Sequence, residues 1–104
     1  MPSRPRRATP PAHVPTAFEA LGFPPAEAEH LRIRADLMLA LTRLIAVRGW
    51  TQAEAAAALG VTQPRVSDLV RGKIERFSID ALVSLLAHVG ADVAVTVRPR
   101  RSAA

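Results

Sequence analysis

Two adjacent stretches of this sequence carry start and stop signals for short helices, and only Gly60 and Val61 separate them. Thr51-Gln52-Ala53-Glu54 has the pattern of a capping box, in which the threonine oxygen and the glutamate carboxylate each accept a hydrogen bond from the other residue's backbone amide. Gly60 can take the left-handed conformation that ends a helix. Thr62 can cap a second helix, and Pro64 is tolerated there because it falls in the first turn. The pattern predicts one helix over Gln52 to Leu59 and another over Thr62 to Arg71.

The second predicted helix has one apolar and one polar face. Val66, Leu69 and Val70 recur at helical spacing and form the face that would be buried. The residues that point away from this face are Pro64, Ser67, Asp68 and Arg71, with Arg65 on the flank. Two short helices joined by a glycine turn, the second with a free polar face, are what a helix-turn-helix requires to place its second helix in the major groove of DNA.

Further helices are predicted on both sides of this pair. The longest runs from Pro25 to Arg48, where apolar residues fall on one face at three- and four-residue spacing, and Gly49 ends it. Ser78 can cap another helix that Gly90 closes, and residues 73–77 form the loop before it. A single capped turn is expected from Thr16 to Gly22. The sequence therefore predicts an all-α bundle of four to five helices.

The segment Asp92 to Arg98 is the exception to this helical pattern. Its valines alternate with other residues, so Val93, Val95 and Val97 fall on one face of a predicted β-strand. One strand cannot satisfy its own backbone, and the chain offers no other convincing strand. The simplest partner is the same strand of a second copy, paired antiparallel about a two-fold axis, which predicts a homodimer.

Size and residue types narrow the classes of function. A chain of 104 residues is one compact domain at most, and it has no cysteine for disulfides or thiolate metal sites. The three histidines share no metal-ligand spacing, and no catalytic triad or carboxylate pair is suggested by spacing. No apolar run is long enough for a membrane span, and no secretory signal is present. We expect a cytoplasmic protein that is not an enzyme and holds no metal or cofactor.

The net charge of +5 is concentrated at the two ends of the chain. Six arginines lie near the termini, whereas every acidic residue lies between Glu19 and Asp92, which leaves the body near neutral. Residues 1–15 are rich in proline and arginine with almost no apolar residues, so we expect a flexible basic arm there and a basic tail over 99–104. Such ends are typical of arms that touch phosphate, but also of tails that only improve solubility.

The segment from Thr51 to Ala56, followed by Leu59 to Lys73, resembles the helix-turn-helix of Xre/Cro-family regulators. The wider frame, with Phe18 to Phe23 before it and the valine-rich strand after it, resembles HigA-type antitoxins. The resemblance implies a lambda-repressor-like domain over residues 16–91, followed by a dimerisation strand over 92–98. It also implies binding to double-stranded operator DNA, repression of its own operon, and a cognate toxin of HigB/RelE type.

By this resemblance, Gln52 would hold phosphate with its side chain and the free amides of its helix. Thr62, Gln63 and Arg65 would approach phosphate or base edges. Glutamine can pair with the adenine edge and arginine with guanine, each contributing roughly 1 to 3 kcal/mol of discrimination. The full set of expected DNA-binding residues is Gln52, Thr62, Gln63, Pro64, Arg65, Ser67, Asp68, Arg71 and Lys73.

Four of these residues have specific alternatives or limits. Pro64 can offer only van der Waals contact, for example with a thymine methyl group. Asp68 could accept from a cytosine amino group, but its three-residue spacing from Arg65 and Arg71 favours an ion pair within the helix. Arg71 and Lys73 would grip the phosphate backbone rather than a base.

The sequence therefore predicts a sequence-specific DNA-binding repressor that works as a homodimer on a palindromic operator, with half-sites about one helical turn apart. The most specific version of this prediction is that the protein is the antitoxin of a type II toxin-antitoxin pair. The alternatives are a stand-alone Xre-family repressor and a protein-interaction module that uses the helix-turn-helix only as a scaffold.

Overall fold

A computed structural model of the protein describes residues 17–99. The predicted arm over residues 1–15, the cap predicted at Thr16 and the tail from residue 100 lie outside this range. The regular elements of the described residues are five α-helices and one 3-10 turn. Their bounds are α1 Ala17–Ala20, α2 Pro25–Arg48, α3 Gln52–Leu59, α4 Gln63–Val70, η1 Ile74–Arg76 and α5 Ile79–His88.

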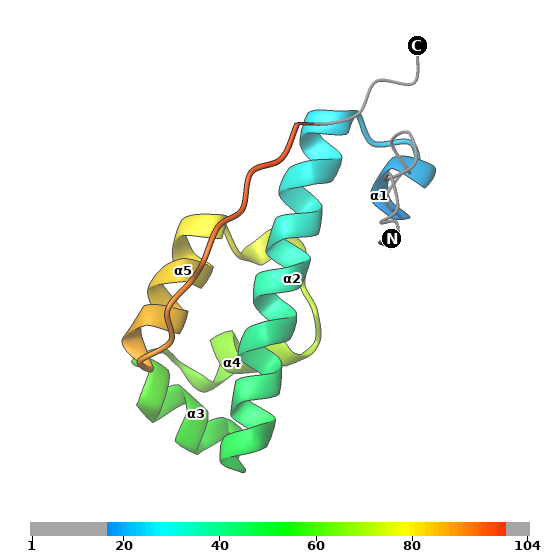
Figure 1. The fold of residues 1–104 in the computed structure, drawn as a ribbon. Helices are drawn as coiled ribbons and strands as arrows, with labels where there is room; N and C mark the ends of the chain where they lie inside the picture. Colours follow the sequence, from blue (N-terminus) through cyan, green and yellow to red (C-terminus); the bar gives the residue numbers. More distant parts are fainter. Residues whose placement is uncertain (1–16, 100–104) are drawn as a thin grey trace, which may run out of the picture.

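The long helix α2 is the support on which the other helices pack (Figure 1). Helix α4 lies against its C-terminal half and α5 lies beside it, while α3 packs on α4 near the C-terminal end of α2. The short helix α1 lies near its N-terminal end, where the rings of Phe18 and Phe23 meet edge to face with centroids 6.3 Å apart. This arrangement confirms the prediction of an all-helical bundle.

The helix ends follow the local signals in the sequence. The capping box of α3 is complete, because the Glu54 amide donates to the Thr51 hydroxyl oxygen at 3.0 Å and the Thr51 amide donates to the Glu54 carboxylate at 2.9 Å. The Thr62 and Ser78 hydroxyl oxygens cap α4 and α5 by accepting from the Arg65 and Ala81 amides, without a reciprocal bond. Gly60 has a φ of 72°, so it ends α3 in the left-handed conformation and sets the tight turn into α4.

One hydrophobic core joins all the elements from α2 onward. It contains no buried polar or charged residue among those that the structure describes. Helix α2 supplies the middle of this core, and Phe77 fills it from the loop before α5 with only 1% of its surface exposed. The remaining members come from the three following helices. The buried cluster is Met38, Leu41, Ile45, Ala55, Ala56, Leu59, Val66, Leu69, Phe77, Leu82 and Leu86.

Residues 91–99, the C-terminal segment, run back along α5 towards the N-terminal half of α2 (Figure 1). They contain no β-strand within the described chain, so the strand predicted over 92–98 is not formed in the single molecule. A strand needs a partner for its backbone hydrogen bonds, and no other strand lies among residues 17–99. Pairing with a second copy therefore remains a prediction.

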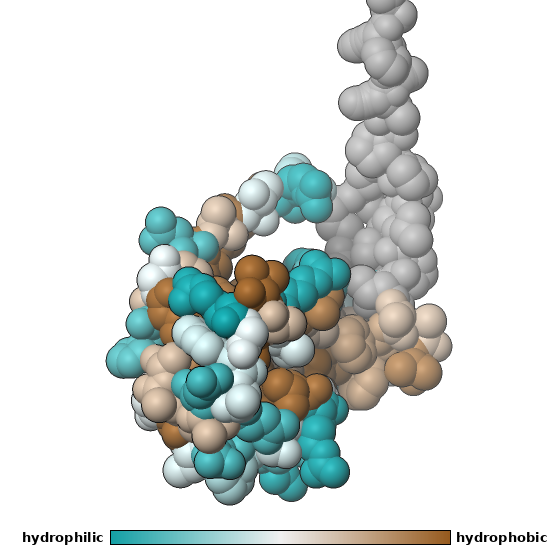
Figure 2. Space-filling model, turned by 90° about the horizontal axis from the view of Figure 1, so that it is seen from below, coloured by the Kyte–Doolittle hydropathy of each residue, from teal (hydrophilic) through white to brown (hydrophobic). Residues whose placement is uncertain are grey.

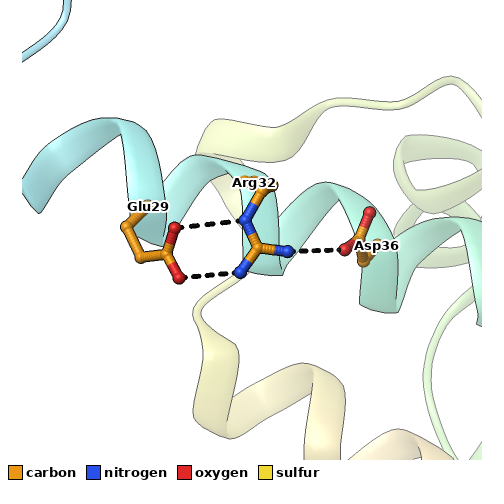
Figure 3. A network of polar contacts seen from close by, with 3 residues as sticks. All are labelled: Glu29, Arg32 and Asp36. Atoms are coloured by element: carbon orange, nitrogen blue, oxygen red, sulfur yellow. Dashed lines mark hydrogen bonds and ion pairs between the residues drawn. The ribbon is translucent and has the colours of Figure 1, made fainter. Parts of the chain in front are cut away.

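The N-terminal half of α2 carries an ion-pair network on its surface (Figure 3). Arg32 donates two hydrogen bonds to the Glu29 carboxylate, at 3.1 and 2.7 Å, and a third to Asp36 at 3.0 Å. The hydrogen bond to Glu29 raises the pKa of the Arg32 guanidinium above its ordinary value. The three side chains lie three and four residues apart on the helix, a spacing that supports helix formation by a few tenths of a kcal/mol per pair.

Candidate nucleic-acid interface

The N-terminus of α4 is held by its own cap and carries exposed side chains. Thr62 accepts a hydrogen bond from the Arg65 amide at 3.3 Å, which fixes the first turn of the helix. Thr62, Gln63 and Pro64 are all exposed. On the opposite side of the same helix, Val66 and Leu69 are fully buried. The helix therefore has its apolar side in the core and presents a polar end to the surroundings.

Helix α3 begins with an exposed residue as well. Gln52 occupies its first position, directly after the capping box. The first amides of a helix have no acceptor within the helix, and together with the helix dipole they favour an anion such as phosphate. Figure 2 views the molecule from below, the side on which α3 lies in Figure 1, and shows polar residues interspersed with apolar ones on this surface. The N-terminus of α3 is thus chemically suited to contact a phosphate of a nucleic-acid backbone.

The end of α4 turns sharply and leaves two basic residues beside the turn. The helix ends at Val70, one residue earlier than predicted, and Arg71 is its C-cap. Gly72 has a φ of 73°, and the Lys73 amide donates back to the Asp68 carbonyl at 3.0 Å. Arg71 is exposed and Lys73 is half-buried. The two residues flank the same glycine, and their contact with DNA stays a prediction.

Arg65 and Asp68 differ from the other expected contacts, because both have partners within the protein. The Arg65 guanidinium donates to the Arg76 carbonyl oxygen at 2.7 Å and lies over the Phe77 ring, 4.0 Å from its centroid. Asp68 accepts from the Arg76 guanidinium at 3.1 Å. The ion pair predicted for Asp68 within α4 is thus replaced by one with a residue eight positions away, because the turn after Gly72 brings Arg76 back to the helix.

Sequence reasoning placed Lys73 on this surface but missed the rest of the loop between α4 and α5. Residues 73–77 were expected to be an irregular loop, but they contain the η1 turn, and Arg76 in it is exposed next to α4. A surface depression beside the turn is lined by three arginines, Arg34, Arg65 and Arg76, together with the start of α5. The only signal in the sequence was a basic residue a few positions after a helix-ending glycine.

Other kinds of site find little support in the described residues. No group of three or more histidine, aspartate or glutamate side chains within residues 17–99 is arranged to hold a metal ion. None of the described helices combines the length and the apolar character needed to cross a membrane. The candidate site is the polar surface formed by the N-termini of α3 and α4 and by the turn that follows α4.

Comparison with known proteins agrees with this geometry. Residues 17–98 match a family model described as a helix-turn-helix domain. Among solved structures, a protein provisionally assigned as an XRE-family transcriptional regulator is 38% identical in sequence, with a TM-score of 0.68. The alignment covers 75% of this chain and 91% of that one. Comparison with curated proteins gives no match.

Proposed function

Because the chain belongs to the helix-turn-helix domain family, we propose that it is a sequence-specific DNA-binding regulator that represses transcription. The observation that carries this proposal is the orientation of α4. Its apolar side is buried in the core, and its N-terminal side chains Thr62, Gln63 and Pro64 are exposed. The likeness to a protein provisionally assigned as an XRE-family regulator supports the same function. In this mode of binding, the N-terminal residues of the second helix contact base edges in the major groove.

The proposed contacts divide into two classes. Gln63, with Thr62 and Pro64 beside it, would meet base edges, because it lies at the exposed start of α4. Backbone phosphates would be held by residues on either side of this helix, namely Gln52, Ser67, Arg71 and Lys73. Arg65 and Asp68 lie on the same surface, but the contacts within the protein engage both side chains.

Selection from a library of random duplexes tests the proposal, because it finds a binding sequence even where the operator is unknown. We expect enrichment of one sequence with two symmetric half-sites about 10 base pairs apart, centre to centre, because a dimer presents two copies of α4 related by a two-fold axis. Failure to enrich any sequence, with protein that remains folded, would leave the scaffold alternative as the better account.

Gln63→Ala separates base recognition from backbone binding. A glutamine that pairs with adenine contributes about 1 to 3 kcal/mol of discrimination, so affinity for the selected duplex should fall roughly 5- to 150-fold. Affinity for a scrambled duplex should stay unchanged. Gln52→Ala is the matched control, because it removes the same side chain from the start of α3 and should weaken both duplexes equally. Equal losses on both duplexes for Gln63→Ala would refute its role in reading bases.

We also propose that the protein is a homodimer joined through residues 92–98. Val95 and Val97 are 80% and 88% exposed, which is unusual for two valines on one face of an extended segment. The backbone of this segment has no strand partner among the described residues. An antiparallel pair with a second copy would satisfy these groups and cover both valines.

Charged substitutions at the two valines test this dimer. In a variant with Val95→Asp and Val97→Asp, like charges would face each other across the two-fold axis, and the protein should sediment as a monomer. Val47→Asp is the control, because Val47 is equally exposed at the far end of α2. A monomeric wild-type protein, or a double variant that keeps the mass of a dimer, would contradict strand pairing.

The most specific form of the proposal is an antitoxin that represses its own operon and neutralises a toxin of HigB/RelE type. An apolar depression between α1, α2 and the end of α4, which includes Phe18, Leu39 and Ile74, offers a protein-binding surface away from the start of α4. The protein encoded by the neighbouring gene should arrest growth when it is expressed alone, and co-expression of this chain should restore growth. If the neighbouring gene product is harmless, the stand-alone repressor is the better account.

A further inference from the structure

Three polar contacts from two different helices converge on the short η1 turn. Arg34 of α2 donates to the Ile74 carbonyl oxygen at 3.3 Å. Arg65 of α4 donates to the Arg76 carbonyl oxygen at 2.7 Å. Asp68 of α4 then accepts from the Arg76 guanidinium at 3.1 Å. A turn of three residues is thus fixed by its first carbonyl, its last carbonyl and one of its side chains.

The turn needs such partners because it is too short to satisfy its own backbone. In a 3-10 turn of three residues the terminal carbonyls have few donors further along the turn, so donors from other elements are the ones that can hold them. The Arg76 carbonyl receives its hydrogen bond from Arg65, and the Ile74 carbonyl receives one from Arg34 in addition to the Phe77 amide at 3.3 Å. Arginine suits this task because its guanidinium carries several donors in one plane.

The planar guanidinium of Arg65 makes contacts through its face as well as through its N–H groups. Its guanidinium lies over the ring of Phe77, with 4.0 Å between the Cζ atom and the ring centroid, and Phe77 itself is fully buried. A planar cation over an aromatic ring gains electrostatic attraction and covers apolar surface at the same time. To reach a guanine edge, Arg65 would have to give up the stacking, the hydrogen bond, or both.

We infer that Arg65 and Arg34 are positioning residues, which fix the η1 turn against α4 and thereby set the place of Lys73 on the DNA backbone. Lys73 directly precedes the turn, and the Arg76 amide donates to the Lys73 carbonyl at 3.0 Å. Any movement of the turn therefore moves Lys73. The consequence for DNA affinity rests on the proposed function, but the bracing of the turn does not.

The bracing is tested first in the free protein. Arg65→Ala and Arg34→Ala should each speed hydrogen exchange at the Arg76 and Phe77 amides by several-fold or more, while exchange in α3 stays unchanged. In the wild-type protein the Arg65 Nε–H proton should show an upfield ring-current shift from Phe77, which Phe77→Leu abolishes. Arg71→Ala is the control, since it removes the same charge from an exposed position beside the turn. Unchanged exchange in both alanine variants, or an unshifted Nε–H proton, would overturn the inference.

The second test uses the salt dependence of binding to the selected duplex. Loss of one phosphate contact in each copy of the dimer reduces the slope of log affinity against log salt by about 2. If Arg65 acts through the turn, Arg65→Ala and Arg65→Lys should both reduce the slope, because lysine lacks the planar group that fits the ring and the carbonyl. The ratio of affinities for selected and scrambled duplexes should remain within about twofold of the wild-type value.

Two other outcomes of this test would overturn the positioning role. A collapse of the affinity ratio with an unchanged slope would assign Arg65 to a base. Restoration of the slope by Arg65→Lys would assign it to a phosphate. If the wild-type protein binds no duplex, the proposed function fails, and the exchange and ring-current measurements still decide whether Arg65 braces the turn.

Discussion

The affinity of the protein for its selected duplex should fall roughly a hundredfold when the salt concentration rises from 50 to 200 mM. The reason is the release of counterions from DNA, which makes log affinity fall linearly with log salt in proportion to the number of phosphates contacted. Arg71 and Lys73 are the cationic residues of the proposed surface in each copy, so a dimer would neutralise about four phosphates, whereas a contact from the neutral Gln52 releases no counterion. Fluorescence anisotropy at four or five salt concentrations measures the slope.

The control for this measurement is a scrambled duplex of the same length. It should show a similar slope with weaker affinity throughout, because phosphate contacts carry no sequence information. Lys73→Ala should reduce the slope by about 2 on both duplexes, because the dimer loses one phosphate contact in each copy. A nearly flat dependence on salt would contradict a surface that rests on several phosphates, even if some binding persists.

Leu41→Ala should lower the free energy of unfolding by about 2 to 5 kcal/mol, a large part of the total stability of a domain of this size. Leu41 lies in the middle of α2 and is 0% exposed in the core shared by the later helices. Its truncation leaves a cavity that neighbouring helices cannot fill without moving, and the lost apolar contacts add to that cost. Urea unfolding followed by circular dichroism measures the change.

Leu39→Ala provides the matched control for this prediction. Leu39 lies two residues earlier in the same helix and is 48% exposed, so the same atoms are removed from a site outside the core. Its effect should be below about 1 kcal/mol. If the two variants lose similar stability, the packing of α3, α4 and α5 on α2 is not the main source of the protein's stability.

Local signals allowed much of this fold to be predicted from the sequence. The capping box at Thr51 and the caps at Thr62 and Ser78 involve groups three residues apart, so the sequence alone brings the partners together. Helix α2 begins and ends where its apolar spacing and Gly49 indicated. Burial of Val66 and Leu69 follows from helical periodicity, and this burial determines which side of α4 is exposed.

The contacts that the sequence did not reveal all depend on the path of the chain after α4. Asp68 pairs with Arg76 and Arg65 bonds to the Arg76 carbonyl only because Gly72 reverses the chain. Phe77 was expected in a loop, yet the η1 turn directs its ring into the core. The predicted strand differs from these contacts, because its pairing partner would belong to a second copy of the chain.

The central claim is that the exposed start of α4 meets DNA in the major groove. Analogues that remove single hydrogen-bond acceptors from the bases test it directly. Replacing purines of the selected half-sites with 7-deaza analogues removes only the N7 acceptor in the major groove, whereas 3-deaza-adenine removes the N3 acceptor in the minor groove. We predict that N7 removal weakens binding at positions in both half-sites and that N3 removal has no effect there. Loss of affinity with the minor-groove analogue alone would contradict the account.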